Sequence, residues 1–140
     1  MELDDTWKPL RDAALAAMEM AHAPYSKFRV GAALEATDGR LFAGCNVENA
    51  SYPVTICAER VALGSAVAAG AVEFRRLYLC ADSTDPAPPC GMCRQALTEF
   101  APDLHILSEG TSGNRVEWRL FDLLPARFLL DPPQQEGHGS

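Results

Sequence analysis

The architecture of this chain follows from Pro88-Pro89-Cys90-Gly91-Met92-Cys93 (residues 88–93), which join a proline-rich loop to a helix predicted over 91–100. Three prolines between 82 and 89 argue against regular structure in that loop. The spacing i, i+3 places the sulfurs of Cys90 and Cys93 on one helical face, near enough to share a tetrahedral metal ion. A single C-x2-C motif is also typical of redox and structural sites, so its meaning depends on further ligands elsewhere.

Helices and strands alternate on both sides of this segment. Apolar residues recur every three to four positions over 7–21 and again over 56–69, which predicts two further helices. Short apolar runs predict strands at 28–34, 41–45, 75–81, 104–107 and 115–120. A turn at 37–40 joins the first two strands as a hairpin. This alternation indicates a layered α/β domain, expected over 1–130 and followed by a flexible tail at 131–140.

Cys57 is the candidate partner of the C-x2-C motif. It begins the sequence Cys57-Ala58-Glu59-Arg60 at the start of the second predicted helix, and a helix N-terminus favours thiolate over thiol. In a half-formed first turn, Cys57 and Glu59 reach one point beyond the helix end. Three thiolates around one Zn²⁺ leave a net negative charge, for which Arg60 is a nearby cation. Three protein ligands with an open fourth position are typical of catalytic zinc, with Glu59 as general acid and base.

The composition restricts the classes of partner. The 140 residues carry 12 basic and 19 acidic side chains, a formal net charge of −7. This balance disfavours nucleic-acid phosphates and anionic lipid surfaces, so we expect a small-molecule partner, no nucleic acid and no membrane. No run approaches the ~20 apolar residues that span a bilayer. The acidic N-terminus lacks an apolar targeting segment, and an odd number of cysteines does not suggest a disulfide framework, so we expect a cytoplasmic location.

Five motifs occur in register along the chain. They are Phe28-Arg29-Val30-Gly31-Ala32-Ala33, Gly44-Cys45-Asn46-Val47-Glu48-Asn49, Cys57-Ala58-Glu59-Arg60, Pro89-Cys90-Gly91-Met92-Cys93-Arg94-Gln95 and Leu123-Leu124-Pro125-Ala126-Arg127-Phe128. Together they resemble the small, homotetrameric, zinc-dependent cytidine deaminases. The resemblance implies a three-layer α/β/α sandwich around a mixed five-stranded sheet, with one zinc ion per subunit. It also implies hydrolytic deamination of cytidine and deoxycytidine to uridine and deoxyuridine, with release of ammonia, in pyrimidine salvage.

The resemblance assigns roles to individual residues. It implies a zinc ion held by Cys57, Cys90 and Cys93, with Glu59 as proton shuttle and Arg60 beside the sulfurs. The substrate-binding residues that it implies are Phe28, Asn46, Val47, Glu48 and Ala58. Two aromatic residues, Tyr52 and Phe128, are implied to reach the substrate of a neighbouring subunit. Pro53 stands where many relatives have glycine, and it stiffens the loop next to Tyr52.

Without the resemblance, several of these residues have ordinary interpretations. Phe28 at the start of a strand packs in the core in most proteins, and Glu48 in a polar loop is usually a solvated charge. Asn46 is a common turn former, and Phe128 is suited to closing the last turn. Cys45 and Cys80 fall on predicted strands, where a free cysteine packs as a small hydrophobe.

Two other functions fit the same residues. One is deamination of a related cytosine compound such as the nucleoside antibiotic blasticidin S, whose deaminase shares the zinc motifs. The other is a non-catalytic structural zinc module, which requires a fourth ligand recruited from Cys45, Cys80 or His105. Glu59 has no role in such a module, whereas it is the general acid and base of the enzyme. The motifs at 28–33 and 123–128 favour cytidine as the substrate.

Overall fold

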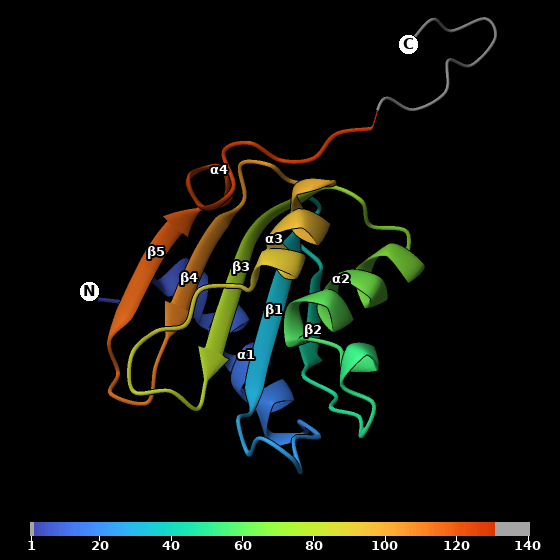
Figure 1. Cartoon of the computed structure of the whole chain (residues 1–140). Coiled ribbons are helices and arrows are strands. Elements are labelled where there is room, and N and C mark those ends of the chain that lie inside the picture. The colour runs from blue at the N-terminus through green and yellow to red at the C-terminus, as the bar shows by residue number, and fades with distance from the viewer. Residues whose placement is uncertain (1, 131–140) are drawn as a thin grey trace, which may run out of the picture.

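The predicted strands pair into a single sheet within residues 2–130, the part of the chain that the computed structural model describes. The strand order is β2-β1-β3-β4-β5 (Figure 1). The strands are β1 (Val30–Ala36), β2 (Leu41–Cys45), β3 (Phe74–Ala81), β4 (His105–Glu109) and β5 (Arg115–Arg119). β3 and β4 are parallel, and the other neighbouring pairs are antiparallel. The sheet is therefore mixed and five-stranded, as the resemblance implied.

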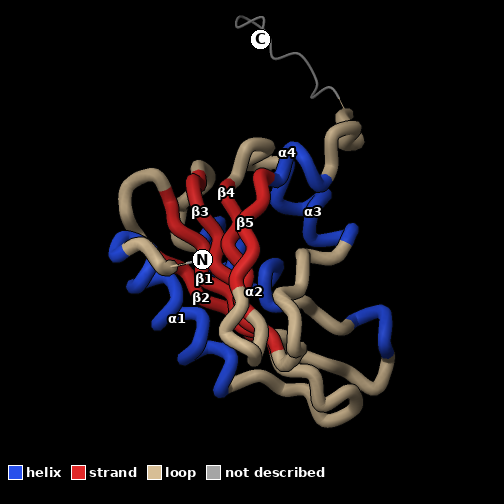
Figure 2. The backbone as a smooth tube through the Cα atoms, turned by 90° about the vertical axis from the view of Figure 1, so that its left-hand side faces the viewer, coloured by secondary structure: helices blue, strands red, loops and turns tan. Residues whose placement is uncertain are grey.

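Helices cover both faces of this sheet (Figure 2). One face carries α1 (Lys8–Glu19), and the opposite face carries α2 (Ala58–Ala68) and α3 (Gly91–Thr98). Short helical segments, η1 (Asp5–Trp7), η2 (Tyr52–Val54) and α4 (Leu120–Leu123), complete the described elements. Side chains alternate along each strand, so Ala33 and Tyr78 pack against α1 while Leu34 and Leu77 join the cluster under α2 and α3. The three-layer α/β/α sandwich is confirmed.

Glycines allow the helices to approach the sheet closely. A Cβ atom on Gly44 in β2 would lie 2.5 Å from the carbonyl oxygen of Ala58 and from the amide nitrogen of Ala62. The first two turns of α2 therefore rest directly on the backbone of β2. Gly31 has the same relation to α1, because a Cβ there would lie 2.0 Å from the carbonyl oxygen of Ala14.

Several predicted boundaries differ from the observed ones. The strand predicted to begin at Phe28 begins at Val30, because Lys27 adopts a positive φ of 63° and turns the chain just before it. The helix predicted over 56–69 begins at Ala58, with Cys57 in an extended conformation as its N-cap. The tail expected at 131–140 lies outside the described residues. No helix of the described part is long and apolar enough to cross a lipid bilayer.

Candidate active site

Three cysteine sulfurs converge where α2 and α3 begin. Cys57 is the N-cap residue of α2, Cys90 is the N-cap residue of α3, and Cys93 lies within the first turn of α3. Their sulfur atoms all lie within 4.8 Å of one another. Among the described residues, no fourth His, Cys, Asp or Glu side chain belongs to this cluster. The two motifs therefore meet in space although 33 positions separate Cys57 from Cys90.

The cluster fits a zinc ion. Two sulfurs bonded to one tetrahedral zinc at about 2.3 Å lie about 3.8 Å apart, and the Sγ atoms of Cys57 and Cys90 are 3.8 Å apart. Both helix N-termini point their unpaired N–H groups towards this region and favour negative charge. Arg60 adds a positive charge, because its Nη2 donates a hydrogen bond to the Sγ of Cys57 at 3.7 Å.

The close approach of the sulfurs makes ionisation of one thiol oppose ionisation of its neighbour. Hydrogen bonds from the Cys93 thiol and from Arg60 lower the pKa of Cys57 to about 5. The hydrogen bond with Cys57, followed by burial, raises the pKa of Cys93. A divalent cation bound to all three sulfurs would remove this competition, since a coordinated thiol is deprotonated. A bound divalent cation is therefore what would allow all three thiols to be ionised at once.

Glu59 is buried beside the sulfur cluster. Its side chain is 5% exposed, and it lines a cavity of about 190 Å³ together with Cys57 and Cys90. Burial raises the pKa of Glu59 to about 7, and the neighbouring Cys57 thiolate acts in the same direction. The cavity is also lined by Phe28, Val30, Asn46, Thr55, Leu79, Ala81, Ala87 and Pro88. The wall is mostly apolar and carries few polar side chains, which suits a flat, largely uncharged ligand.

Asn46 is one of the polar residues that line this cavity. Its Oδ1 accepts a hydrogen bond from the amide nitrogen of Val30 at 2.9 Å, and its Nδ2 donates to the carbonyl oxygen of Phe28 at 2.7 Å. The amide therefore holds the entry of β1 in place. An asparagine side chain has further donor and acceptor capacity, so each end retains one position for a ligand.

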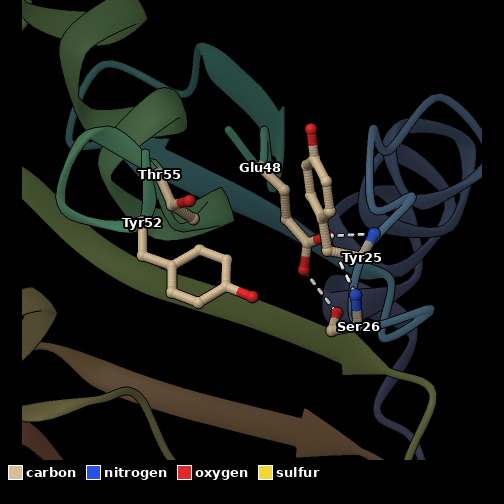
Figure 3. A pocket seen from close by; sticks show the side chains of 5 residues that line it. All are labelled: Tyr25, Ser26, Glu48, Tyr52 and Thr55. Carbon is tan, nitrogen blue, oxygen red and sulfur yellow. Dashed lines mark hydrogen bonds between the residues drawn. The ribbon is translucent and has the colours of Figure 1, made fainter. Parts of the chain in front are cut away.

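Glu48 lines a neighbouring cavity of about 320 Å³, together with Tyr25, Ser26, Tyr52 and Thr55 (Figure 3). Its Oε1 accepts hydrogen bonds from the amide nitrogens of Tyr25 and Ser26, and its Oε2 accepts one from the Ser26 hydroxyl. The rings of Tyr25 and Tyr52 meet edge to face, with centroids 6.5 Å apart. Thr55 lines both cavities, so the two are adjacent.

The remaining residues implied by the resemblance lie outside these linings. Ala58 is fully buried in the core, so only its backbone can reach the cavity at the start of α2. Val47 is 40% exposed and forms isolated bridges with His22 and Ile56. The side chain of Phe128 is 69% exposed, although its backbone is held by two hydrogen bonds to the Gln95 amide.

Sequence reasoning missed Tyr25, Ser26 and Thr55 as lining residues. Tyr25 followed a predicted helix end, and no spacing connects any of the three with Glu48. Arg94 directly follows the C-x2-C motif. Its Nε donates to the carbonyl oxygen of Pro89 and its Nη1 to that of Leu123, so it braces the loop before Cys90 against α4.

The fold and the site define a class: an α/β/α protein with a zinc-binding thiolate cluster at two helix N-termini and a buried carboxylate beside it. Residues 6–108 match the cytidine and deoxycytidylate deaminase zinc-binding region, and the chain belongs to that family.

Individual relatives agree with this assignment. A cytidine deaminase of Sporosarcina psychrophila is 44% identical over 113 residues, which are 80% of this chain and 83% of that protein. A crystal structure of cytidine deaminase from Burkholderia pseudomallei matches with a TM-score of 0.83 and 46% identity, over 86% of this chain and 98% of that one. Blasticidin-S deaminase of Bacillus cereus is more distant, at 32% identity over 74% of this chain and 79% of its own length.

Proposed function

We propose that this protein catalyses the zinc-dependent hydrolytic deamination of cytidine and deoxycytidine, yielding uridine or deoxyuridine and ammonia. One observation carries the proposal: a buried glutamate, Glu59, lines the same cavity as two of the three clustered cysteines. The cytidine deaminases of Sporosarcina psychrophila and Burkholderia pseudomallei, at 44% and 46% identity, are more similar to the chain than the blasticidin-S deaminase, at 32%. Deamination of these nucleosides belongs to the salvage of pyrimidines.

The residues of the chain divide the reaction between metal binding and proton transfer. Cys57, Cys90 and Cys93 would hold zinc, which supplies the Lewis acidity that makes water a competent nucleophile at neutral pH. Glu59 takes a proton from the attacking water and gives it to ring nitrogen N3 as C4 is attacked. It then takes the proton of the new hydroxyl group on C4 and gives it to the amine, so that the C4–N bond breaks, ammonia leaves and the C4 carbonyl forms. One carboxyl group therefore alternates between base and acid. Arg60 balances the charge of the thiolates through its hydrogen bond to Cys57.

The two adjacent cavities suit the two halves of a nucleoside. The smaller cavity, next to the cysteines, takes the pyrimidine, with Phe28 packed against the ring. The backbone of Ala58, which joins the lining residues Cys57 and Glu59, would meet the edge of that ring. Glu48 in the larger cavity and Asn46 in the smaller one hold the sugar hydroxyls where the two cavities adjoin. Val47 supports the loop between these two residues. A carboxylate accepts hydrogen bonds from hydroxyls and repels a phosphate, so nucleosides are preferred over nucleotides.

Ammonia release from a panel of purified substrates tests this function. We expect turnover of cytidine and deoxycytidine, loss of turnover with a zinc chelator, and its return when zinc is restored. Cytidine monophosphate should be used at least tenfold less efficiently than cytidine, because Glu48 repels its phosphate. Equal efficiency on both would contradict the role of Glu48. Preferred turnover of blasticidin S would assign the chain to that activity instead.

X-ray absorption on the zinc-loaded protein separates the enzyme from a structural zinc module. Three sulfurs and one light atom around the zinc are expected, since only Cys57, Cys90 and Cys93 are clustered among the described residues. Cys80 packs in the cluster under α1, on the other side of the sheet. Four sulfurs would support the module.

We also propose that the protein is a homotetramer of the cytoplasm. Large apolar side chains are exposed near the two cavities and along the end of the described chain; they include Tyr52, Val54, Phe121, Phe128, Leu129 and Leu130. Exposed apolar side chains in this number support association with further copies. Within such an assembly, Tyr52 and Phe128 would reach the substrate of a neighbouring subunit. The five cysteines are free, which supports a reducing compartment.

A further inference from the structure

The hydroxyl of Ser26 lies between the two adjacent cavities. It donates a hydrogen bond to Oε2 of Glu48 in the larger cavity, as Figure 3 shows. The same oxygen accepts a hydrogen bond from the amide nitrogen of Phe28 at 3.0 Å, and Phe28 lines the smaller cavity next to Glu59. One side-chain atom therefore connects the carboxylate of one cavity with the aromatic residue of the other.

The backbone around Ser26 holds an uncommon conformation. Lys27 has a φ of 63°, and it is the one residue other than glycine with a positive φ in the described part of the chain. Its amide nitrogen bonds to the carbonyl oxygen of Ala23 at 3.0 Å, which closes a tight turn. A left-handed residue without glycine persists where surrounding contacts require it, and such residues concentrate at functional sites. Here the turn places the amide and the hydroxyl of Ser26 within hydrogen-bonding distance of Glu48, and the hydroxyl also within reach of the Phe28 amide.

We propose that Ser26 is a positioning residue: its hydroxyl fixes the carboxylate of Glu48 relative to Phe28 and so sets the distance between the sugar-binding and pyrimidine-binding ends of the site. This inference rests on the proposed function, because it takes Glu48 as a ligand of the sugar. Oε2 of Glu48 is oriented by Ser26, while Oε1 is occupied by two amide nitrogens. The carboxylate thus accepts three hydrogen bonds from the chain and keeps acceptor capacity for about one more, which a sugar hydroxyl can use.

The charge of Glu48 supports this role. The Ser26 hydroxyl, followed by the amide nitrogens of Ser26 and Tyr25, holds the pKa of the Glu48 carboxyl below its usual value. His22 adds a favourable charge when protonated, and the phenols of Tyr25 and Tyr52 line the same cavity. An ionised acceptor makes stronger hydrogen bonds to hydroxyls than a neutral one does.

Kinetics of the zinc-loaded protein test the inference. Ser26 is exposed, so Ser26→Ala should leave the fold intact. We expect it to lower kcat/KM for cytidine about tenfold, since it removes a hydrogen bond to a charged group. Ser26→Thr keeps the hydroxyl and should restore most of the activity. The matched control is Ser112→Ala, because Ser112 also donates to one oxygen and accepts from the amide two residues later, in the turn before β5.

A double-mutant cycle with Glu48→Ala shows whether Ser26 acts through Glu48. The loss caused by Ser26→Ala should shrink to less than about threefold in the Glu48→Ala background. An equal loss in both backgrounds, or a Ser26→Ala variant as active as Ser112→Ala, would overturn the inference. Full activity of Glu48→Ala alone would overturn it too, and would also remove Glu48 from the proposed site.

Carboxyl NMR tests the positioning without any turnover. With ¹³C-labelled glutamate, the Glu48 resonance is identified by its loss in Glu48→Gln. It should titrate at a higher pH in Ser26→Ala than in the unmodified protein or in Ser112→Ala. An unchanged titration would overturn the inference. If the unmodified protein releases no ammonia from cytidine, the proposed function fails while this measurement still decides the role of Ser26.

Discussion

Glu59 combines burial with proximity to the sulfur cluster. The C-x-E spacing predicts that its carboxyl reaches the metal site, and the structure shows the surroundings that spacing cannot describe. Only 5% of the side chain is exposed, and burial raises its pKa to about 7. A carboxyl group with a pKa near neutrality can both accept and donate a proton at physiological pH.

The substitution Glu59→Gln keeps the shape of the side chain and removes its ability to transfer protons. We expect zinc binding to persist, because the three sulfurs are untouched, while kcat falls by about 10²–10⁴-fold. Zinc content measured by mass spectrometry and ammonia release measured on the same sample check this. Glu73→Gln, at an exposed glutamate outside the cavity lining, serves as control. Undiminished turnover with zinc bound would disprove the role of Glu59.

At the scale of elements, the site depends on how closely α2 lies on the sheet. The absence of a side chain at Gly44 lets β2 contact the backbone of Ala58 and Ala62. Cys57 precedes and Glu59 follows Ala58, so the contact places the metal-binding end of α2. The sequence Gly44-Cys45-Asn46 predicts a strand end, but it carries no sign of this helix contact.

Gly44→Ala should therefore lower the free energy of unfolding by about 1–3 kcal/mol, because the new methyl group would overpack two backbone atoms. Gly64→Ala is the matched control. Gly64 lies within α2 and a Cβ there meets nothing within 4 Å, so the better helix propensity of alanine should raise stability by up to about 1 kcal/mol. Urea unfolding of both zinc-loaded variants measures the difference. Equal stabilities would show that α2 does not rest on Gly44.

At the scale of the whole molecule, hydrogen bonds to the backbone attach the end of the described chain to α3, while its apolar side chains remain exposed to solvent. The Gln95 amide in α3 bonds both the amide nitrogen and the carbonyl oxygen of Phe128, a residue that is 69% exposed. Anchoring of this kind presents an aromatic ring outward in a defined position. It fits the proposal that Phe128 completes the site of another subunit.

Mixed assemblies test this proposal. Phe128→Ala should lower kcat/KM for cytidine by up to about tenfold, because one aromatic contact contributes up to about 1.5 kcal/mol of binding free energy. Co-expression with the inactive Glu59→Gln chain should restore activity, because intact Phe128 then reaches the unmodified Glu59 of a neighbour. Co-expression with the double variant Phe128→Ala/Glu59→Gln should restore nothing. Absence of rescue in the first mixture, or a mass in sedimentation equal to one 15.1 kDa chain, would contradict the proposal.

Some features of the fold and site were predictable because they depend on neighbours in sequence. Strand and helix periodicity predicted the alternating elements and a layered α/β domain, whereas the three-layer order was implied by the resemblance. The pairs Cys90–Cys93 and Cys57–Glu59 are local, since the geometry of one helical turn controls both. The predicted start of the first strand was less accurate, because the Ser26 hydroxyl accepts a hydrogen bond from the amide nitrogen of Phe28 and keeps that residue out of the sheet.

Other features needed the tertiary structure, because they join residues far apart in the chain. Arg11 of α1 bonds Glu109 of β4 across 98 positions, and Glu109 also accepts a hydrogen bond from the buried hydroxyl of Tyr78. No periodicity encodes such a contact. By itself the sequence determined the two local pairs, Cys90 with Cys93 and Cys57 with Glu59, since short-range geometry at a helix start suffices for that. The meeting of the two pairs across 33 positions needed the fold. Only the packing of α2, α3 and the loop at 22–28 decided which cavity each side chain enters, because those directions depend on long-range contacts.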